Sequence, residues 1–450
     1  MARPQAGLIG PAAARVAAAL LVTSLLTGCA RPRPRPAAEP LDAEGQALAA
    51  IPARTDIDSY RAWIGPAPAE PPPAGFAVRQ IDGRWWLVAP SGRLYWASAL
   101  RHAGCGLETD GPVTPYRDAL LHKWGAGLFG VKCPARVLDR MAGWGFTAIG
   151  TASSDSLFRP RVLPFLTPGL MADKLSIPLA APGLPDAFLG DLVVKLSPAL
   201  SPLANWQDAP FCLGHPGGVR ADWSGLAASV LALPAKAPAK VEWIRTLREA
   251  YGKIAVLNRA WGVSATSFEA LRWPGDGKAT DIAKADLMSF RARFADWLYA
   301  AVLHAIRFAD KTHLMFGMAV VPGVTPPEVT AALAKHADVI VVEVGDAEPA
   351  LPAIEALAAQ LHRPLYVIAA RPAAVGPAEL PAAWSRVMER LAAMSDVVGA
   401  EVSDYLPNAD GSAFVGWDDV PEILLTEAAR RTNDRLLRLH AGQPEPAPKH

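Results

Sequence analysis

The sequence of 450 residues has few cysteines, no excess of either charge and no serine-nucleophile motif. Its four cysteines match no metal-binding spacing, and the His102–Cys105 region lacks further ligands, so no metal and no cofactor are predicted. The 44 basic and 43 acidic residues nearly cancel, so nucleic acid is not an expected partner. Without a Gly-x-Ser-x-Gly motif, serine-triad chemistry has no support.

The chain also lacks an apolar run long enough to span a bilayer near its N terminus. Val16–Leu26 is short and follows Arg3 and Arg15, which predicts an export signal. The sequence Leu26-Thr27-Gly28-Cys29 resembles the lipobox of bacterial lipoproteins. The resemblance implies removal of residues 1–28, lipidation of Cys29, and an anchor in the cell envelope. Ala30 resembles the pattern of outer-membrane lipoproteins that face the periplasm; an ordinary signal peptide is the alternative.

The next segment, residues 29–74, is rich in proline, which removes backbone hydrogen-bond donors and fixes φ. We expect a stiff tether, whose arginines at 31–36 act as spacer or touch anionic headgroups. Residues 75–97 hold β-formers around the turn signals Asp82-Gly83 and Pro90-Ser91-Gly92, which predicts a small antiparallel meander. Residues 438–450 are predicted to be a loose tail.

Helical patterns alternate with short apolar runs over residues 98–437, which is typical of βα units around a parallel sheet. The predicted fold class is α/β: a (β/α)8 TIM barrel, forming one large domain, preceded by the meander. The expected strands are Leu94–Leu100, Thr147–Gly150, one between Val162 and Leu179, Phe211–Gly214, Leu314–Val320, Val339–Val344, Leu365–Ala369 and Val397–Val402. Two states remain possible for Cys105, Cys133 and Cys212: all three are buried thiols, or two of them form a disulfide and the third stays a free thiol.

Four stretches resemble agarase-like, β-galactosidase-related glycoside hydrolases of the retaining (β/α)8 clan. They are Ile81–Val88, Trp144–Phe146, Tyr251–Gly262 and Gly411–Asp418, and the resemblance runs from about Phe76 to Leu436. It implies a glutamate acid/base after strand four and a glutamate nucleophile at the end of strand seven. Retaining chemistry needs both carboxyl groups, about 5 to 5.5 Å apart.

Both glutamates are missing at the positions that the resemblance assigns. The strand-four motif falls on Leu213–Trp223 and places its Asn-Glu pair on Val219 and Arg220. The strand-seven glutamate falls on Ala369. Because a guanidinium stays protonated, Arg220 cannot deliver the proton. Further departures from the family lie at the ends of strands one, two and five, namely Arg101, Thr151 and Ala319. No catalytic residue is therefore predicted.

Several residues at strand ends are nevertheless candidates for ligand binding: Arg101, His215, Arg220, Trp223, Glu343, Glu401, Asp404 and Tyr405. Arg220 could bind an anionic or hydroxyl-rich ligand, with a salt bridge to Asp222 as the alternative. His215 could be a base or a hydrogen-bond donor, or have a structural role. Glu401 and Asp404 could bind sugar hydroxyls or a cation, or be solvated. Trp223 and Tyr405 are candidate sugar platforms. The tryptophans of the predicted meander are expected to be buried in the hydrophobic core rather than to bind sugar.

These features predict an exported lipoprotein with a glycoside-hydrolase-like barrel that no longer hydrolyses glycosides. It would bind an oligo- or polysaccharide in the old cleft, or a protein of the envelope. The alternative is an active glycosidase that uses displaced carboxylates, namely Glu343, Glu401 or Asp404. A second alternative is a structural envelope or assembly protein.

Overall fold

The computed structural model describes residues 42–65, 72–106, 114–159, 161–167, 179–181, 184–216, 222–372, 376–407 and 413–443. The predicted signal segment, Cys29, Val219 and Arg220 lie outside the described residues. The chain divides into two compact units, Met1–Ala49 and Ala50–His450. The described part of the first is α2 (Ala43–Ala49), where Asp42 Oδ1 accepts a hydrogen bond from Gly45 N at 2.7 Å. In the described ranges, no helix combines the length and apolarity needed to cross a membrane.

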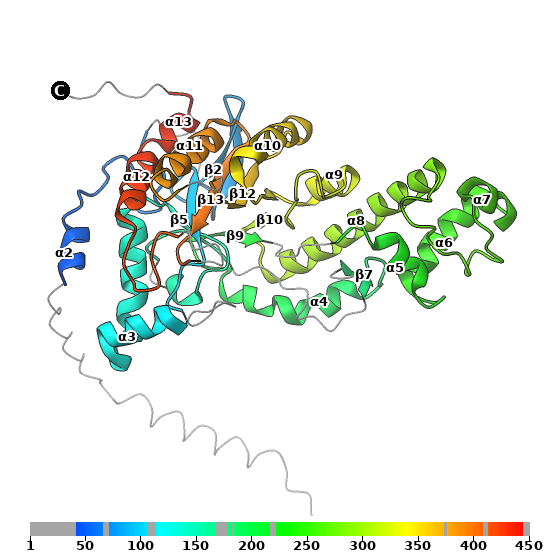
Figure 1. The fold of residues 1–450 in the computed structure, drawn as a ribbon, viewed down its shortest axis with the longest axis horizontal. Coiled ribbons are helices and arrows are strands. Elements are labelled where there is room, and N and C mark those ends of the chain that lie inside the picture. The colour runs from blue at the N-terminus through cyan, green and yellow to red at the C-terminus, as the bar shows by residue number, and fades with distance from the viewer. Residues whose placement is uncertain are drawn as a thin grey trace, which may run out of the picture. The chain divides into compact units, whose positions relative to one another are not determined.

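Eight parallel strands form the barrel of the second unit (Figure 1). In chain order they are β4 (Ala97–Arg101), β5 (Ala148–Ile149), β6 (Phe165–Leu166), β9 (Cys212–Pro216), β10 (Leu314–Phe316), β11 (Ile340–Glu343), β12 (Leu365–Ala370) and β13 (Val397–Asp404). The sheet order is β10-β9-β6-β5-β4-β13-β12-β11, and the parallel bridges Phe316–Val339 and Val320–Val342 join its two edges. The predicted (β/α)8 fold is confirmed.

An antiparallel sheet of β1 (Ala77–Ile81), β2 (Arg84–Val88) and β3 (Leu94–Tyr95) closes the N-terminal end of the barrel. Its buried Leu87 and Tyr95 belong to the same apolar cluster as the inward-facing residues of the barrel strands. Tyr95 Oη donates to Thr147 O at 2.8 Å, and Trp96 Nε1 donates to Val397 O at 2.7 Å. The predicted meander is therefore the floor of the barrel, and the first barrel strand begins at Ala97 rather than Leu94.

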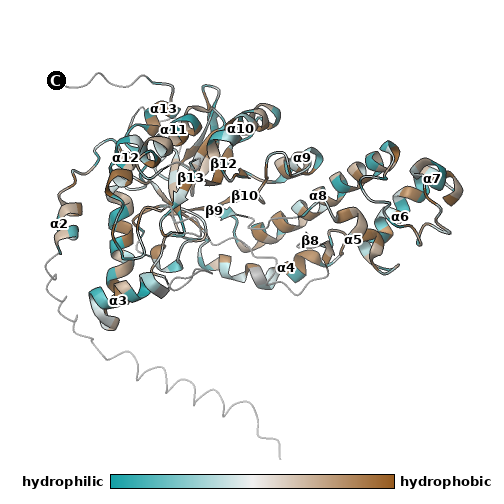
Figure 2. Cartoon of the chain, in the orientation of Figure 1, coloured by the Kyte–Doolittle hydropathy of each residue, from teal (hydrophilic) through white to brown (hydrophobic). Residues whose placement is uncertain are grey.

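Helices cover the outside of the barrel: α3 (Thr114–Gly143), α4 (Leu192–Leu200), α9 (Pro327–His336), α10 (Ala347–Leu361), α11 (Leu380–Ala393), α12 (Ile423–Asn433) and α13 (Leu436–His440). The chain changes direction within α3 at Gly125, whose φ is +68°. Short 3-10 turns, Asp155–Leu157 and Ser201–Asn205, and the hairpin of β7 (Leu179–Ala181) and β8 (Leu184–Pro185) complete the connections. Hydrophobic and hydrophilic residues alternate along these helices (Figure 2), as expected where one face is buried.

The long insertion predicted after strand four is helical. It contains α5 (Leu226–Ala232), α6 (Pro238–Tyr251), α7 (Ile254–Trp261) and α8 (Asp281–Ala309). Its core is aromatic, because the ring of Trp243 stacks on Phe290 with centroids 4.4 Å apart and lies near Trp261 and Trp273. The C-terminal part of α8 leads into β10, so the insertion returns directly to the barrel.

Two domain boundaries differ from the prediction. The predicted tether includes Ile57 and Trp63, which are at most 9% exposed and pair with each other. The predicted loose tail begins inside α13, where His440 is fully buried and contacts Ala392 O at 2.8 Å and Trp85 O at 2.9 Å. In both cases a few apolar or aromatic residues at the edge of a polar segment bury themselves against the barrel.

Candidate ligand site at the barrel mouth

Polar side chains gather where β4 and β13 end, at the C-terminal mouth of the barrel. Glu401 pairs with Ala99, which faces the barrel interior, so the carboxyl of Glu401 points inward. Gly150, just after β5, leaves the space that this carboxyl needs: a Cβ there would lie 2.9 Å from Glu401 Cδ. Asp404 pairs with Arg101 nearer the rim. TIM-barrel enzymes place their active sites at this end.

The carboxyl of Glu401 is fully buried and held by several donors. Thr151 donates to it through its backbone N at 2.9 Å and its hydroxyl at 2.6 Å. Tyr366 Oη donates at 3.1 Å, and Arg101 Nε lies 3.9 Å from Oε2. Burial raises the pKa of Glu401 above the ordinary glutamate value, although the charge of Arg101 and the hydrogen bonds from Thr151 and Tyr366 act in the opposite direction.

Arg101 joins this carboxyl to a second one. Its Nη1 lies 3.9 Å from Oδ1 of Asp404, which is 3% exposed and also contacts His102 Nδ1 at 2.9 Å. The side chains of Arg101 and His102 are 21% and 32% exposed, so the basic side chains rather than the carboxylates reach the surface. Asp404 and Glu401 therefore hold the two basic side chains at the rim.

Strand seven brings no carboxylate to the mouth. The residues at the end of β12 are Ile368 and Ala369, both half-buried, and no acidic residue lies between Leu365 and Pro372. Ala369 has a φ of +55°, and positive φ values also occur at three other strand ends, at His102, Ala152 and Ser403. Such backbone strain gathers at binding and active sites, and each instance costs about 1–3 kcal/mol.

Glu343 ends β11 as predicted, and the register places it beside Ile368 of β12. Its backbone N donates to Val320 O at 2.8 Å, and the residue is half-buried. The structure thus brings Arg101, Glu343, Glu401 and Asp404 to the same end of the barrel. Glu343 lies on the side of β11 and β12, two strands away from β13.

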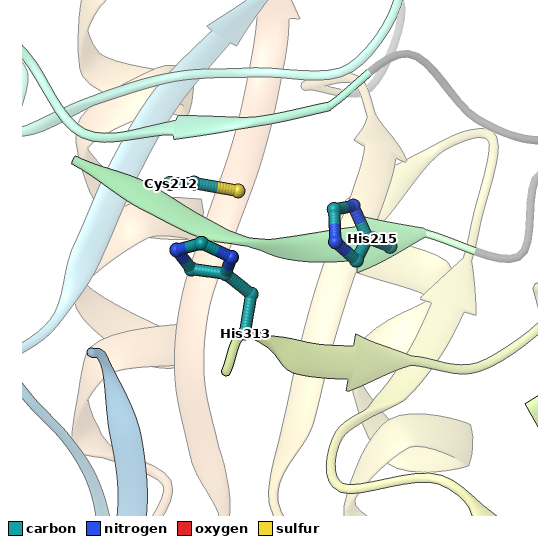
Figure 3. A group of neighbouring side chains, drawn as sticks. All are labelled: Cys212, His215 and His313. Atoms are coloured by element: carbon teal, nitrogen blue, oxygen red, sulfur yellow. The ribbon is translucent and has the colours of Figure 1, made fainter. Parts of the chain in front are cut away.

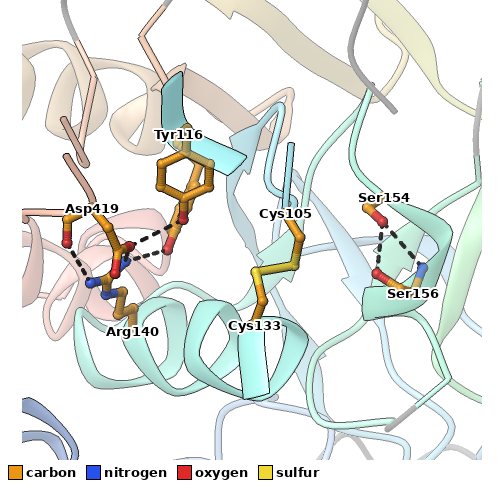
Figure 4. Close-up of a disulfide and its surroundings, with 8 residues drawn as sticks. Cys105, Tyr116, Cys133, Arg140, Ser154, Ser156 and Asp419 are labelled. Atoms are coloured by element: carbon orange, nitrogen blue, oxygen red, sulfur yellow. Dashed lines mark hydrogen bonds and ion pairs between the residues drawn. A yellow bond between two sulfur atoms is a disulfide. The ribbon is translucent and has the colours of Figure 1, made fainter. Parts of the chain in front are cut away.

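The two predicted sugar platforms are buried. Trp223 is 5% exposed and packs edge-on against Phe294. Tyr405 is fully buried and accepts a hydrogen bond from Arg140 Nη1 at 3.0 Å. Arg140 also donates to Asp419, which accepts from Tyr116 at 3.3 Å, so Tyr405 belongs to a polar cluster between α3 and the segment before α12 (Figure 4). A ring packed in this way cannot stack on a sugar without moving.

His215 faces the helical layer instead of the mouth. A bulge in β9 turns Leu213 and Gly214 inward in succession, so that His215 pairs with the outward-facing Met315. Its Nε2 lies 2.8 Å from Asp310 Oδ2, and His313 Nδ1 lies 2.6 Å from the same oxygen. Burial alone would raise the pKa of Asp310, but the hydrogen bonds from the two histidines hold it far below the ordinary value.

Cysteine pairing resolves one alternative left open by the sequence. Cys105 and Cys133 form a disulfide between the segment after β4 and α3 (Figure 4). Cys212 is a free, buried thiol, and burial raises its pKa. It lies close to His215 and His313, a juxtaposition that the sequence reasoning missed. The signal was present as two pairs with the same spacing, Cys212-x-x-His215 and Asp310-x-x-His313.

The fold of this chain is similar to that of solved agarase structures. Solved structures with this fold include an agarase, AgWH50C (20% identity, TM-score 0.74, covering 88% of this chain and 69% of that one). An exo-beta-agarase is 19% identical with a TM-score of 0.75, covering 89% of this chain and 70% of that one. PfGH50B is 18% identical with a TM-score of 0.76, covering 90% of this chain and 73% of that one. At these identities the likeness establishes the fold. No family model matches the sequence, and a search of the curated proteins finds no match.

Proposed function

We propose that the chain is an exported lipoprotein whose barrel mouth binds carbohydrate without hydrolysing it. The observation that carries this proposal is the state of Glu401, a carboxyl fully buried among Thr151, Tyr366 and Arg101. A nucleophile must reach an anomeric carbon, and an acid must reach the leaving oxygen. A carboxyl enclosed by its own partners does neither.

The end of strand seven supports the same proposal. The family resemblance assigns the nucleophile to Ala369, and its neighbour Ile368 is equally unable to attack. What the described rim offers instead is the guanidinium of Arg101 and the ring of His102, both partly exposed. These groups donate hydrogen bonds, which sugar hydroxyls accept.

The first test is turnover. Purified protein is incubated with agarose oligosaccharides, chosen because similar folds belong to agarases, and with aryl β-galactosides. We expect no product above the blank. Turnover that disappears in Glu343→Gln, Glu401→Gln or Asp404→Asn would refute the proposal and establish the alternative of displaced carboxylates.

The second test is binding, by glycan array and then calorimetry. His102→Asn keeps a residue that tolerates positive φ but removes the ring, and we expect it to weaken binding about tenfold, the equivalent of one lost hydrogen bond. Arg386→Met, on the exposed face of α11, is the matched control and should bind normally. If no glycan binds, the cleft-binding proposal fails, and a partner protein or a structural envelope role takes its place.

The anchor requires its own test, because Cys29 lies outside the described residues. Metabolic labelling with a fatty acid should mark the wild-type chain and not Cys29→Ala, and fractionation should place the labelled chain in the outer membrane. A labelled Cys29→Ala chain would contradict lipidation at this residue.

A further inference from the structure

The strongest unexplained feature is the buried cluster between β9 and the turn that precedes β10. It consists of Cys212 and His215 on β9, and of Asp310 and His313 in the turn (Figure 3 shows the cysteine and the two histidines). All four residues are at most 1% exposed. The thiol and one nitrogen from each ring lie within 4.8 Å of one another.

The atoms that face one another are those that bind transition metals. Asp310 Oδ2 lies 2.8 Å from His215 Nε2 and 2.6 Å from His313 Nδ1. The Cys212 thiol lies within 4.8 Å of one nitrogen of each ring. One sulfur, two imidazole nitrogens and one carboxylate oxygen make a set of four donors. Zn²⁺ accepts all three kinds of donor in a tetrahedral arrangement.

The atoms that face away are each held by a second partner. Thr167 Oγ1 lies 2.9 Å from His215 Nδ1, and Ala209 O lies 3.0 Å from His313 Nε2. Asp310 Oδ1 accepts from the backbone N of Thr312 at 2.8 Å and of His313 at 3.1 Å. Metal-binding histidines and carboxylates are oriented by such outer hydrogen bonds.

The two ring nitrogens of His313 face two different oxygens. Nδ1 faces the Asp310 carboxylate and Nε2 faces the Ala209 carbonyl. A metal ion in place of the Nδ1 proton would satisfy the same oxygen and nitrogen, while Nε2–H still donates to Ala209.

We propose that Cys212, His215, Asp310 and His313 form a closed, structural Zn²⁺ site that fastens β9 to the start of β10. Tetrahedral Zn²⁺ needs ligand atoms about 3.3 to 3.6 Å apart. The carboxylate oxygen and the two ring nitrogens would therefore move apart by about half an ångström, and the thiol would move toward them. Because the cluster has no exposed atom of consequence, the ion would enter as the chain folds.

The test uses the full chain produced with zinc in the medium and passed through gel filtration. Elemental analysis should find one Zn²⁺ per chain. Refolding with Co²⁺ alone should give a thiolate-to-cobalt charge-transfer band, which reports a sulfur ligand in the wild-type chain without any substitution. Absence of both the retained zinc and the cobalt band would overturn the proposal.

Variants separate this site from adventitious binding. Cys212→Ala should lose the cobalt band, and Thr167→Val, which removes an outer hydrogen bond, should weaken zinc affinity about tenfold. His440→Gln is the matched control, because His440 is equally buried and bonded but lies elsewhere. A cobalt band that persists in Cys212→Ala, or a zinc affinity of Thr167→Val equal to that of the wild-type chain, would refute the site. Loss in these variants with retention in His440→Gln supports it.

Discussion

One buried carboxylate lies inside the barrel and another lies in the turn that precedes β10, and their pKa values shift in opposite directions. Glu401 faces the interior near the mouth, and its pKa is raised. Asp310 lies on the outer side, beneath the helical layer, and its pKa is lowered. Neither side chain has any exposed surface, so exposure does not explain the difference.

The hydrogen-bond donors around each carboxylate explain why the two pKa values shift in opposite directions. Two histidines donate to one oxygen of Asp310, and two backbone N–H groups donate to the other, so the charged form has four donors. Glu401 has three neutral donors, and its cation, Arg101, is 3.9 Å away. The hydrogen bonds from two imidazole rings and two backbone N–H groups outweigh desolvation at Asp310, whereas two hydroxyls, one backbone N–H group and a distant guanidinium do not at Glu401.

The largest effect should come from Asp310→Asn. This change leaves two buried histidines without their anion and should lower the free energy of unfolding by about 3–5 kcal/mol, measured with urea in the presence of a chelator. Because the pKa of Asp310 is lowered on folding, its contribution is present at neutral pH and is lost only as pH falls below the ordinary value of 3.8. The exposed Asp281→Asn is the control. A loss under about 1 kcal/mol would contradict a stabilising role for the Asp310 carboxylate.

The second-largest loss of stability should come from Arg101→Met. It removes the cation that faces both Glu401 and Asp404, and we expect a loss of about 2 kcal/mol at pH 8. At pH 5 more of Glu401 is protonated and needs no cation, so the loss should be smaller. Urea unfolding at the two pH values checks this, with Arg386→Met as control. A loss that does not vary with pH would show that Glu401 does not titrate in this range.

Glu401→Gln should change stability by about 1 kcal/mol or less at neutral pH, because the amide oxygen still accepts from Thr151 and Tyr366. The informative quantity is the slope of the free energy of unfolding against pH. A carboxyl with a raised folded-state pKa makes the wild-type chain less stable as pH rises above the ordinary value of 4.5. The variant should lack that decline. If the free energy of unfolding of the wild-type chain instead rises with pH above 4.5, the pKa of Glu401 is not raised and the contrast with Asp310 is wrong.

Tyr366→Phe should have the smallest effect, about 0.5 kcal/mol, the low end for one hydrogen bond, because it removes one donor from Glu401 and leaves the ring in place. It should also raise the pKa of Glu401 further and move the decline with pH to higher values. Tyr299→Phe, in a buried tyrosine of α8, is the control and should leave the pH profile unchanged. Identical profiles for Tyr366→Phe and wild type would remove Tyr366 from the description of this carboxyl.

The barrel could be predicted from the sequence because each strand is an apolar run between helical patterns, as in Val339–Val344 and Leu365–Ala369. The direction of individual side chains could not. His215 was expected in the mouth, but one extra residue in β9 turns it to the other face of the sheet, as a bulge does. The floor was predicted as a meander without its role, because sheet-to-barrel contacts join distant residues.

Part of the candidate site could also be read from the sequence. Arg101, Glu343, Glu401 and Asp404 lie at strand ends as expected. Their pairing with Thr151, Tyr366 and His102 depends on strand register, which a single sequence does not specify. The metal-ligand spacing in two separate segments was overlooked because each pair alone is common, and only the fold brings them together.

The floor of the barrel has a consequence for how the chain is made. Trp96 on the floor bonds to Val397, 301 residues later, and Trp85 bonds to Ser395 and His440. Contacts of such separation form late, because loop closure must precede them. During synthesis β1, β2 and β3 can pair with one another, but their contacts with Val397, Ser395 and His440 must wait until nearly the whole chain has emerged. The floor is therefore among the last parts of the barrel to reach its final state.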